Sequence, residues 1–445
     1  MKNWRIKVKN FGKIKDADIE LSNFTSFLGD NNSGKSYMMS LIYGLLSLKF
    51  FLLNGMQIDR NMSNYNQMKN WLKDLLDAPQ KEIILTEDRY NDLLGLLNEI
   101  LNYNKLIIMH TIFNANVDIE SLEVLIPYYE KISIVKSKEV EGEEFVNFVT
   151  IKIGDKKRET IRIKEEQLKE EQTQDLLLIF IAEMILGTPL QEPSIYKPCY
   201  LPTSRTGFLL TYKTLAERSL SDKFNVEKST KNLLTRPSSD FLTNLSMLTA
   251  RDFNYEYKEI IEFIEEDILE GRVDAQELPA SDFIYIPKGT KDSIPMFISS
   301  GVVTEITPLL LLLKHKKNIS MLMMEEPEMC LHPKLQWSIT RALIQLSNMN
   351  MPVIITTHSD TILQHINNMI QLDKNPQREE LLAQYGYKDT DLITKDQVRF
   401  YQFDVKEHKT EVRALEYGEY GFIAPTFNDM LENLLRQSRE FEIEE

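Results

Sequence analysis

Residues 29–36 of the chain read GDNNSGKS, from Gly29 to Ser36, and this stretch decides the fold. It fits the pattern G-x-x-x-x-G-K-[ST], in which glycines let the backbone wind so that successive N–H groups face phosphate oxygens. An apolar stretch over residues 24–28 precedes it, and a dense apolar stretch from Lys35 to about Leu53 follows. Because strand, glycine-rich loop and helix is the context in which this motif binds phosphate, the sequence predicts a nucleotide site.

Individual residues of this loop have distinct expected roles. The lysine would reach the β and γ phosphates, and the serine after it would ligate Mg²⁺. A flexible Gly/Asn turn is the alternative, and the flanking strand and helix disfavour it. The predicted binding residues are Gly29, Asn31, Asn32, Ser33, Gly34, Lys35 and Ser36.

A second apolar strand, expected from Ile319 to Met324, ends in the carboxylates of the string EEPE over residues 325–328. Parallel nucleotide-binding sheets place their metal-holding and water-activating groups at this end of a strand. Glu325 is predicted to hold Mg²⁺ through water, and Glu326 to orient or deprotonate the attacking water. The alternative is a solvated helix start, since helix N-termini favour glutamate.

Two further elements point to the same chemistry. His358 follows an apolar strand one strand–helix unit after the carboxylates, so contact with the γ phosphate or the attacking water is favoured over a purely structural histidine. Ser299, Ser300 and Gly301 directly precede an apolar helix and predict a second anion site, although a serine N-cap explains the pattern equally well. Because one nucleotide needs a single phosphate loop, the second site is expected to serve a neighbouring copy's ATP.

The chain as a whole reads as α/β. Beyond about residue 280 strands and helices alternate, which predicts parallel strands joined by crossover helices. Residues 54–194 differ, because amphipathic stretches and three short alternating segments predict an inserted helical region with a few strands. A helical stretch from Phe241 to Leu269 predicts a short arm, and residues 426–441 predict a closing helix.

Composition narrows the class of protein. The 445 residues carry a formal net charge of −15, which argues against a surface that is basic throughout and against general coating of nucleic acid. The two cysteines, Cys199 and Cys330, make neither a disulfide framework nor a zinc-type cluster, so a reducing, cytoplasmic compartment is expected. No signal peptide is expected at the start, and the most apolar run, Ile306 to Leu313, is far shorter than the roughly 20 residues of a membrane-spanning helix.

Several strings together resemble the ABC-class ATPases of the SMC, RecF and OLD type. These strings are the loop at 29–36, Ser299-Ser300-Gly301, EEPEMCLHP over residues 325–333 and THS over residues 357–359. The pattern E-E-P-E-x-x-L-H-P is specific to the OLD-like branch, which NFG over residues 10–12 and LPTSR over residues 201–205 also resemble. The resemblance covers roughly residues 1–50 and 195–425.

This resemblance implies a head-to-tail dimer that holds two ATP molecules, each between one head's phosphate loop and the other's Ser-Ser-Gly signature. Carried over to this chain, Ser299 contacts the γ phosphate in trans, Glu326 is the catalytic base and His358 is the switch histidine. Leu331-His332-Pro333 would be the D-loop at the dimer seam.

There are departures from the wider class. Position 325 is Glu where that class has Asp, and no Q-loop glutamine can be placed. Arg205 could lie near the nucleotide or could be an ordinary surface arginine.

The fold class expected from the resemblance is an ABC-type P-loop ATPase head. Its sheet would be mainly parallel with N-terminal antiparallel strands, and the head would carry an inserted helical and α+β lobe and a short helical arm. The expected domains are the head over residues 1–53, 195–208 and 281–425, the inserted lobe over 54–194, the arm or lobe over 209–280, and the C-terminal helix over 426–445.

The expected cofactors are ATP and Mg²⁺, and the expected activity is ATP hydrolysis. OLD nucleases carry a C-terminal Toprim domain, whereas the chain after His358 reads as a hairpin and a closing helix, so no nuclease is expected here. ATPases of this kind without Toprim resemble those of bacterial anti-phage systems such as PARIS, Septu and abortive-infection operons, where a separately encoded nuclease or toxin acts as the effector.

Two other functions stay open. One is a RecF- or SMC-like repair or chromosome ATPase that acts directly on DNA, which the net charge disfavours without excluding a local basic groove. The other is the nucleotide-binding subunit of a transporter, which the family strings disfavour.

Overall fold

The computed structural model describes residues 4–47, 57–77, 82–128, 132–141, 144–153, 158–187, 197–224, 234–248, 253–275 and 283–441. The chain forms two compact units. The first comprises Met1–Gly12, Asp16–Glu20 and Gly44–Lys197, and the second comprises Lys13–Lys15, Leu21–Tyr43 and Pro198–Glu445. Whether the expected boundaries at residues 54, 195, 209 and 281 separate domains stays a prediction.

The second unit is built on a sheet whose centre is parallel. Its strands follow one another in the order β16-β15-β3-β14-β13-β9. The pairs β13–β14, β14–β3 and β3–β15 are parallel, whereas β15 and β16 form an antiparallel hairpin. The strands are β3 (Phe24–Gly29), β9 (Lys197–Leu201), β13 (Ile319–Glu325), β14 (Val353–Thr357), β15 (Val398–Lys406) and β16 (Lys409–Ala414).

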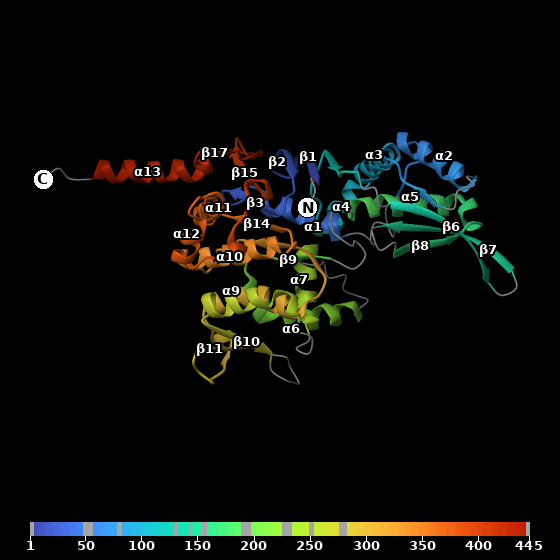
Figure 1. The fold of residues 1–445 in the computed structure, drawn as a ribbon. Helices are drawn as coiled ribbons and strands as arrows, with labels where there is room; N and C mark the ends of the chain where they lie inside the picture. The colour runs from blue at the N-terminus through green and yellow to red at the C-terminus, as the bar shows by residue number, and fades with distance from the viewer. Residues whose placement is uncertain are drawn as a thin grey trace. The chain divides into compact units, whose positions relative to one another are not determined.

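Helices connect these strands, as a parallel sheet requires. Figure 1 shows α9 and α10 as neighbouring helices of this unit, and both contribute to its apolar core. The helices are α1 (Lys35–Ser47), α6 (Arg205–Phe224), α7 (Arg236–Ser246), α8 (Lys258–Phe263), α9 (Gly301–His315), α10 (Pro333–Asn348), α11 (Asp360–Asp373), α12 (Arg378–Tyr385) and α13 (Pro425–Phe441). The mixed, mainly parallel α/β fold class is therefore confirmed.

Local sequence explains where several of these helices begin and how they are buried. In α10, His332 is the N-cap residue, its Nδ1 accepts the Lys334 N–H, and Pro333 occupies the first helical position, where no N–H is needed. In α9, residues 303–314 are all buried, as expected of a helix that is apolar on every side. The described part of α1 ends at Ser47, and the expected continuation to Leu53 lies outside the described residues.

The expected single helix from Phe241 to Leu269 is wrong. The structure has α7, then α8, then a π-helical turn over Ile264–Ile268. A small antiparallel sheet follows, made of β10 (Gly271–Ala275), β11 (Phe283–Pro287) and β12 (Ile294–Pro295) (Figure 1). α7 ends at Ser246, and before α8 Asn254 caps a 3-10 turn over Tyr255–Tyr257. The Asn254 side chain accepts the Glu256 N–H, and its own N–H donates to the carbonyl oxygen of Lys314. Apolar periodicity alone does not reveal such a bend.

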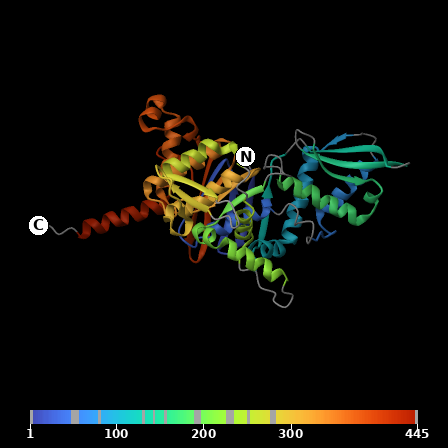
Figure 2. The same ribbon diagram turned by 90° about the horizontal axis from the view of Figure 1, so that it is seen from below.

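The first unit contains strands in the order β5-β1-β2 and a separate antiparallel sheet in the order β4-β6-β7-β8. The long strands of this separate sheet are drawn in teal and green in Figure 2. Three short strands expected near residues 131–163 are confirmed as β6, β7 and β8. The elements of this unit are β1 (Arg5–Phe11), β2 (Ile14–Glu20), α2 (Ser63–Asp77), β4 (Glu82–Ile84), α3 (Glu87–Tyr103), α4 (Lys105–Phe113), β5 (Ser121–Leu125), β6 (Ile132–Glu141), β7 (Glu144–Ile153), β8 (Arg158–Lys164) and α5 (Glu171–Gly187).

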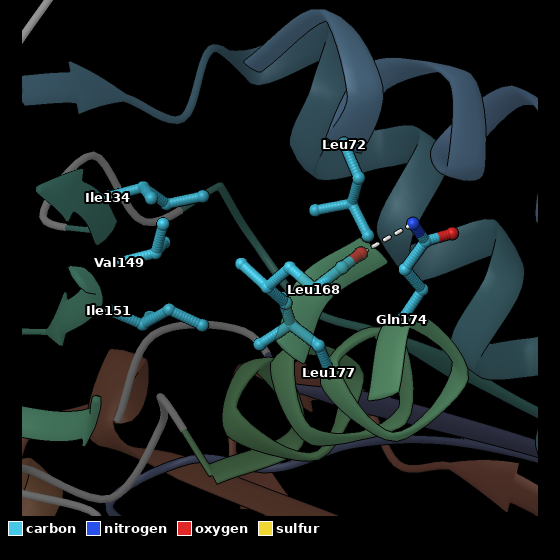
Figure 3. Close-up of a pocket in the computed structure, with 7 residues that line it drawn as sticks. All are labelled: Leu72, Ile134, Val149, Ile151, Leu168, Gln174 and Leu177. Atoms are coloured by element: carbon cyan, nitrogen blue, oxygen red, sulfur yellow. Dashed lines mark hydrogen bonds between the residues drawn. The ribbon is translucent and has the colours of Figure 1, made fainter. Parts of the chain in front are cut away.

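A small apolar cavity lies where the four-stranded sheet packs against α2 and α5. Figure 3 shows its side chains converging, with the Gln174 side-chain amide donating a hydrogen bond to the carbonyl oxygen of Leu168 at 2.7 Å. Its volume of about 10 Å³ leaves room for no more than a water-sized group, so we regard it as a packing gap. In the described part of the chain, no helix combines the length and apolar character needed to cross a membrane.

Candidate functional site

The glycine-rich loop winds as its sequence predicts. Gly29 has φ +137°, and a Cβ atom there would lie 2.4 Å from the carbonyl oxygen of Phe403 on β15. Gly34 has φ +98°, and its Cβ would lie 3.0 Å from Cγ1 of Ile14. Asn32 adds a third positive φ, of +63°. Only glycine fits positions 29 and 34 without strain, so the tight path of the loop depends on both.

Lys35 is the first residue of α1, and its ammonium lies inside this loop. Nζ donates hydrogen bonds to the carbonyl oxygens of Gly29 at 2.9 Å and Asp30 at 2.7 Å, and to Oγ of Ser33 at 3.3 Å. Burial lowers the pKa of Lys35 to about 8, although carboxylates that include Glu326 act in the opposite direction. The protein's own oxygens thus hold the cation at the point where the motif is expected to bind phosphate.

Glu325 ends β13 as a buried carboxylate with two donors. The Tyr200 hydroxyl donates to Oε1 at 2.7 Å, and the Thr203 N–H donates to Oε2 at 3.0 Å. Burial raises the pKa of Tyr200 well above its ordinary value, so the phenol stays protonated and remains a donor. Tyr200 lies on β9, and no sequence pattern connects it with Glu325, since the two are 125 positions apart.

Glu326 and His358 face each other across neighbouring strand ends. Nε2 of the histidine lies 3.7 Å from Oε1 of the glutamate. Burial raises the pKa of Glu326, with Glu325 acting in the same direction. Burial also lowers the pKa of His358, and the charge of Lys35 adds to this, so the imidazole is neutral at pH 7. A carboxylate with a raised pKa beside a neutral imidazole is suited to taking a proton from water.

Glu328 positions the histidine, a role that sequence reasoning missed. Its Oε1 accepts the His358 N–H at 2.6 Å, which ties the backbone after β14 to the backbone after β13. The next residue, Ser359, donates its hydroxyl to Oε1 of Gln336 on α10 and caps α11 by accepting the Ile362 N–H. The EEPE string could have suggested this role, because its fourth residue is a third carboxylate at the same strand end.

The Ser-Ser-Gly signature lies at the N-terminus of α9. Ser300 is the N-cap residue and accepts the Val303 N–H at 3.4 Å, while Ser299 donates its hydroxyl to the carbonyl oxygen of Pro295 at 3.1 Å. Ser300 and Gly301 are exposed, and a Cβ on the glycine would lie 3.7 Å from Cys330. Within the described ranges, no hydrogen bond or ion pair joins these serines to the loop at 29–36.

The structure therefore brings some of the predicted residues together and leaves others apart. Lys35, Glu325, Glu326 and His358 form one group at the carboxyl ends of β3, β13 and β14, because each influences the pKa of another or contacts it. Among the described residues, the hydrogen bonds of the signature serines are local. Of the remaining loop residues, Ser33 is buried, Gly34 is half-buried, and Asn31, Asn32 and Ser36 are exposed.

The donor atoms at this edge fit Mg²⁺. The Ser36 hydroxyl is exposed next to Lys35, and the two oxygens of Glu325 keep lone pairs beyond the hydrogen bonds they accept. Hydroxyl, carboxylate and phosphate oxygens are the ligands that this ion prefers. Among the described residues, no group of three or more His, Cys, Asp and Glu side chains could hold a metal alone.

The pKa of Lys35 predicts how nucleotide affinity depends on pH. With a pKa of about 8 in the free protein, Lys35 loses most of its charge by pH 9, whereas a bound triphosphate raises that pKa. Binding above pH 8 should therefore take up a proton, and affinity for ATP should fall about tenfold between pH 7 and pH 9. Isothermal titration calorimetry with ATP and EDTA, in two buffers of different ionisation enthalpy, measures both effects.

The matched control is Lys15→Ala, which removes an exposed lysine paired with Glu411 on the surface. It should show the same proton uptake as wild type. Proton uptake that stays at zero from pH 8 to pH 9 in wild type would contradict the expectation, because Lys35 would then be fully protonated throughout.

A family model described as an AAA ATPase domain matches residues 1–363 of the 445. No curated protein matches the chain.

Among solved structures, the chain is similar to an Smc head domain bound to the C-terminal winged-helix domain of ScpA. The two sequences are 13% identical, and the match covers 93% of this chain and 97% of that chain with a TM-score of 0.38. It is also similar to the SMC head domain from Thermotoga maritima, with 11% identity, coverage of 94% and 100%, and a TM-score of 0.35. These values are too low to transfer a function to this chain.

Proposed function

The chain belongs to the AAA ATPase domain family, and we propose that it binds ATP with Mg²⁺ and hydrolyses the terminal phosphate bond. One observation carries the proposal. The ammonium of Lys35, the carboxylate of Glu326 and the imidazole of His358 converge where the glycine-rich loop meets the ends of two parallel strands. A cation for the phosphates, a base and a polar neighbour for the attacking water are the groups that phosphoryl transfer to water needs.

Each residue has a defined part in this proposal. Lys35 leaves the loop carbonyls and pairs with the β and γ phosphates, while the backbone N–H groups of residues 31–36 face the phosphate oxygens. Glu326 accepts a proton from the attacking water, and His358 orients that water or the γ phosphate. Mg²⁺, held by Ser36 and Glu325, would neutralise charge on the phosphate oxygens.

The exposed signature supports a dimer that sandwiches ATP. Ser299, Ser300 and Gly301 offer hydroxyls and the N-terminus of a 15-residue helix, which favours an anion. Since their contacts within the described chain are local, the phosphate we assign to them belongs to the ATP of a second copy. ATP then stabilises the closed dimer through contacts that the open form lacks, and hydrolysis releases it.

Within this scheme, the ATPase acts as a switch for a separately encoded effector in bacterial anti-phage defence. Support for this step comes from the sequence, namely the E-E-P-E-x-x-L-H-P pattern and the resemblance to defence ATPases. Cells that carry the gene together with its neighbouring genes should plate phage at a reduced efficiency. The Lys35→Ala variant should plate phage like cells without the genes, whereas Lys15→Ala should protect like wild type.

A different result would favour the alternative, a RecF- or SMC-like ATPase acting on DNA. For that alternative we expect the genes to leave phage plating unchanged. We also expect the protein to bind DNA with an affinity that falls steeply as salt rises, because phosphate contacts release counterions. The net charge of −15 makes a large number of such contacts unfavourable. A fluorescence anisotropy titration of duplex DNA from 50 to 200 mM salt distinguishes the two functions.

A further inference from the structure

Arg205 is fully buried, at 0% exposure, and is the first residue of α6. The sequence left it either near the nucleotide or on the surface, and the surface alternative is wrong. An arginine cannot lose its charge in a protein, so its burial requires partners that use the whole guanidinium. Those partners come from α9, from the end of β13 and from Pro202, which directly follows β9.

The first partner is Glu305, in the second turn of α9, which is itself only 1% exposed. Nη2 of Arg205 lies 3.1 Å from its Oε1, and Nε donates to its carbonyl oxygen at 3.2 Å. The same carboxylate accepts the backbone N–H groups of Arg205 and Thr206, which begin α6. Glu305 thus satisfies both the buried arginine and the N-terminus of α6, and it lies on the helix that begins with the Ser-Ser-Gly signature.

The second set of partners consists of backbone carbonyl groups. Nη1 donates to the carbonyl oxygen of Pro202, which directly follows β9. At the end of β13, Nη1 also donates to the carbonyl oxygen of Glu325, and Nη2 donates to that of Glu326 at 3.1 Å. Glu326 has φ +43°, a left-handed conformation that costs a non-glycine residue free energy. On its other side the Glu326 N–H donates to the carbonyl oxygen of Thr356 at 2.9 Å.

These bonds clamp one residue from both sides. A strained conformation persists only when its surroundings hold it in place, and here a charged donor and a strand carbonyl do so. Because φ and ψ of residue 326 set the direction of its side chain, they also set where its carboxylate lies relative to His358. An ion pair with a purely structural role would not need hydrogen bonds to the carbonyl oxygens of both Glu325 and Glu326.

We propose that Arg205 is a positioning residue, which holds the carboxylate of Glu326 in its working place and, through Glu305, ties it to the signature helix α9. This inference rests on the proposed function, in which Glu326 is the base. It implies that a movement of α9 on closing against a second copy would reach the chain's own base directly. The connection from α9 to the base consists of the Arg205–Glu305 ion pair and the carbonyl groups of Glu325 and Glu326.

The decisive variant is the double substitution Arg205→Met with Glu305→Met. Removing both charges avoids an unpaired buried ion, and apolar replacement of a buried pair is often tolerated. We expect a folded protein whose affinity for ATP in EDTA is within about threefold of wild type, since the described partners of the Arg205 side chain lie outside the loop at residues 29–36. Its kcat should fall by about 10- to 100-fold, because small displacements of a catalytic group have effects of this size.

The separation of binding from turnover provides a readout that a merely structural role would not give. Arg205 donates hydrogen bonds to the carbonyl oxygens of Glu325 and Glu326 at the end of β13. A general loss of packing would lower the affinity for ATP and kcat together. A displaced base instead lowers kcat and leaves the affinity close to wild type.

The matched control is Lys314→Met with Glu265→Gln, which removes a partly buried ion pair with an N–O distance of 2.6 Å. This pair joins the other end of α9 to the π-helical turn over Ile264–Ile268. Its described contacts do not include Glu325 or Glu326, so kcat and the affinity for ATP should match wild type. A double variant at 205 and 305 with wild-type kcat would overturn the inference. So would a loss of equal size in the control pair.

If the double variant does not fold, the Arg205→Lys variant tests the same inference. Lysine keeps the charge, but its three N–H donors cannot replace the five side-chain contacts that Arg205 makes. We expect a folded protein with a lower Tm than wild type and, below that temperature, a kcat reduced about tenfold. Wild-type kcat in a folded Arg205→Lys protein would overturn the inference. Wild-type kcat in Glu326→Gln would instead overturn the proposed base.

Discussion

The Glu326→Gln protein is expected to bind ATP and to hydrolyse it at least about 100 times more slowly than wild type. Glutamine keeps the size of the side chain and the backbone contacts to Thr356 and Arg205, so the site stays intact. It lacks the ionised oxygen that takes a proton from water. Steady-state phosphate release gives the rate, and calorimetry with ATP and Mg²⁺ gives the affinity.

The same variant should accumulate the ATP-bound dimer, because closure persists when hydrolysis cannot end it. Light scattering after gel filtration should show a larger mass with ATP than with ADP. Asp360→Asn is the matched control, since it removes one exposed carboxylate two residues after His358. Its turnover should stay within about twofold of wild type. Glu326→Gln hydrolysing at the wild-type rate would show that another group is the base.

The Lys35→Ala variant is expected to lose most of its affinity for ATP. The loop keeps its backbone N–H groups but loses the charged donor, and hydrogen bonds to charged groups contribute about 1.5 to 3 kcal/mol each. The carboxylates of Glu325, Glu326 and Glu328 then face the triphosphate without the cation that offsets them. Affinity should fall about 10- to 100-fold, and hydrolysis at limiting ATP should fall at least as far.

Thermal unfolding with and without ATP separates this loss from misfolding. A ligand at 100 times its Kd stabilises the folded protein by about 2.7 kcal/mol, so wild type should gain Tm with ATP. Lys35→Ala should unfold cooperatively and gain little or nothing at the same concentration. Lys15→Ala, in which the lost lysine is exposed, should gain as much as wild type. Equal gains in all three proteins would contradict the role of Lys35.

The parts of this molecule that the sequence predicted well depend on local geometry or on a topological rule. The loop from Gly29 to Ser36 could be predicted because positive φ values select glycine at positions 29 and 34. The proximity of Glu326 and His358 could be predicted because the carboxyl ends of neighbouring parallel strands meet at one edge. Neither prediction required knowledge of distant side chains.

What could not be predicted depends on pairs of residues far apart in the sequence. Arg205 and Glu305 are 100 positions apart, and nothing in either neighbourhood indicates that the two side chains would be buried together. Tyr200 and Glu325 are a second example. The 3-10 turn that Asn254 caps was missed for a related reason, because the Asn254 N–H donates to the carbonyl oxygen of Lys314, at the distant end of α9.

At Glu326, the residue that is best for stability differs from the residue that the proposed chemistry needs, because the backbone there is left-handed. Glycine would adopt φ +43° at no steric cost, and asparagine or aspartate at less cost than glutamate. Drift under selection for stability alone would therefore tend to replace the glutamate with a residue that cannot serve as the base at the same reach. Retention of Glu at this position in relatives that hydrolyse ATP, and its loss in relatives that only bind ATP, is the evolutionary pattern that this backbone conformation implies.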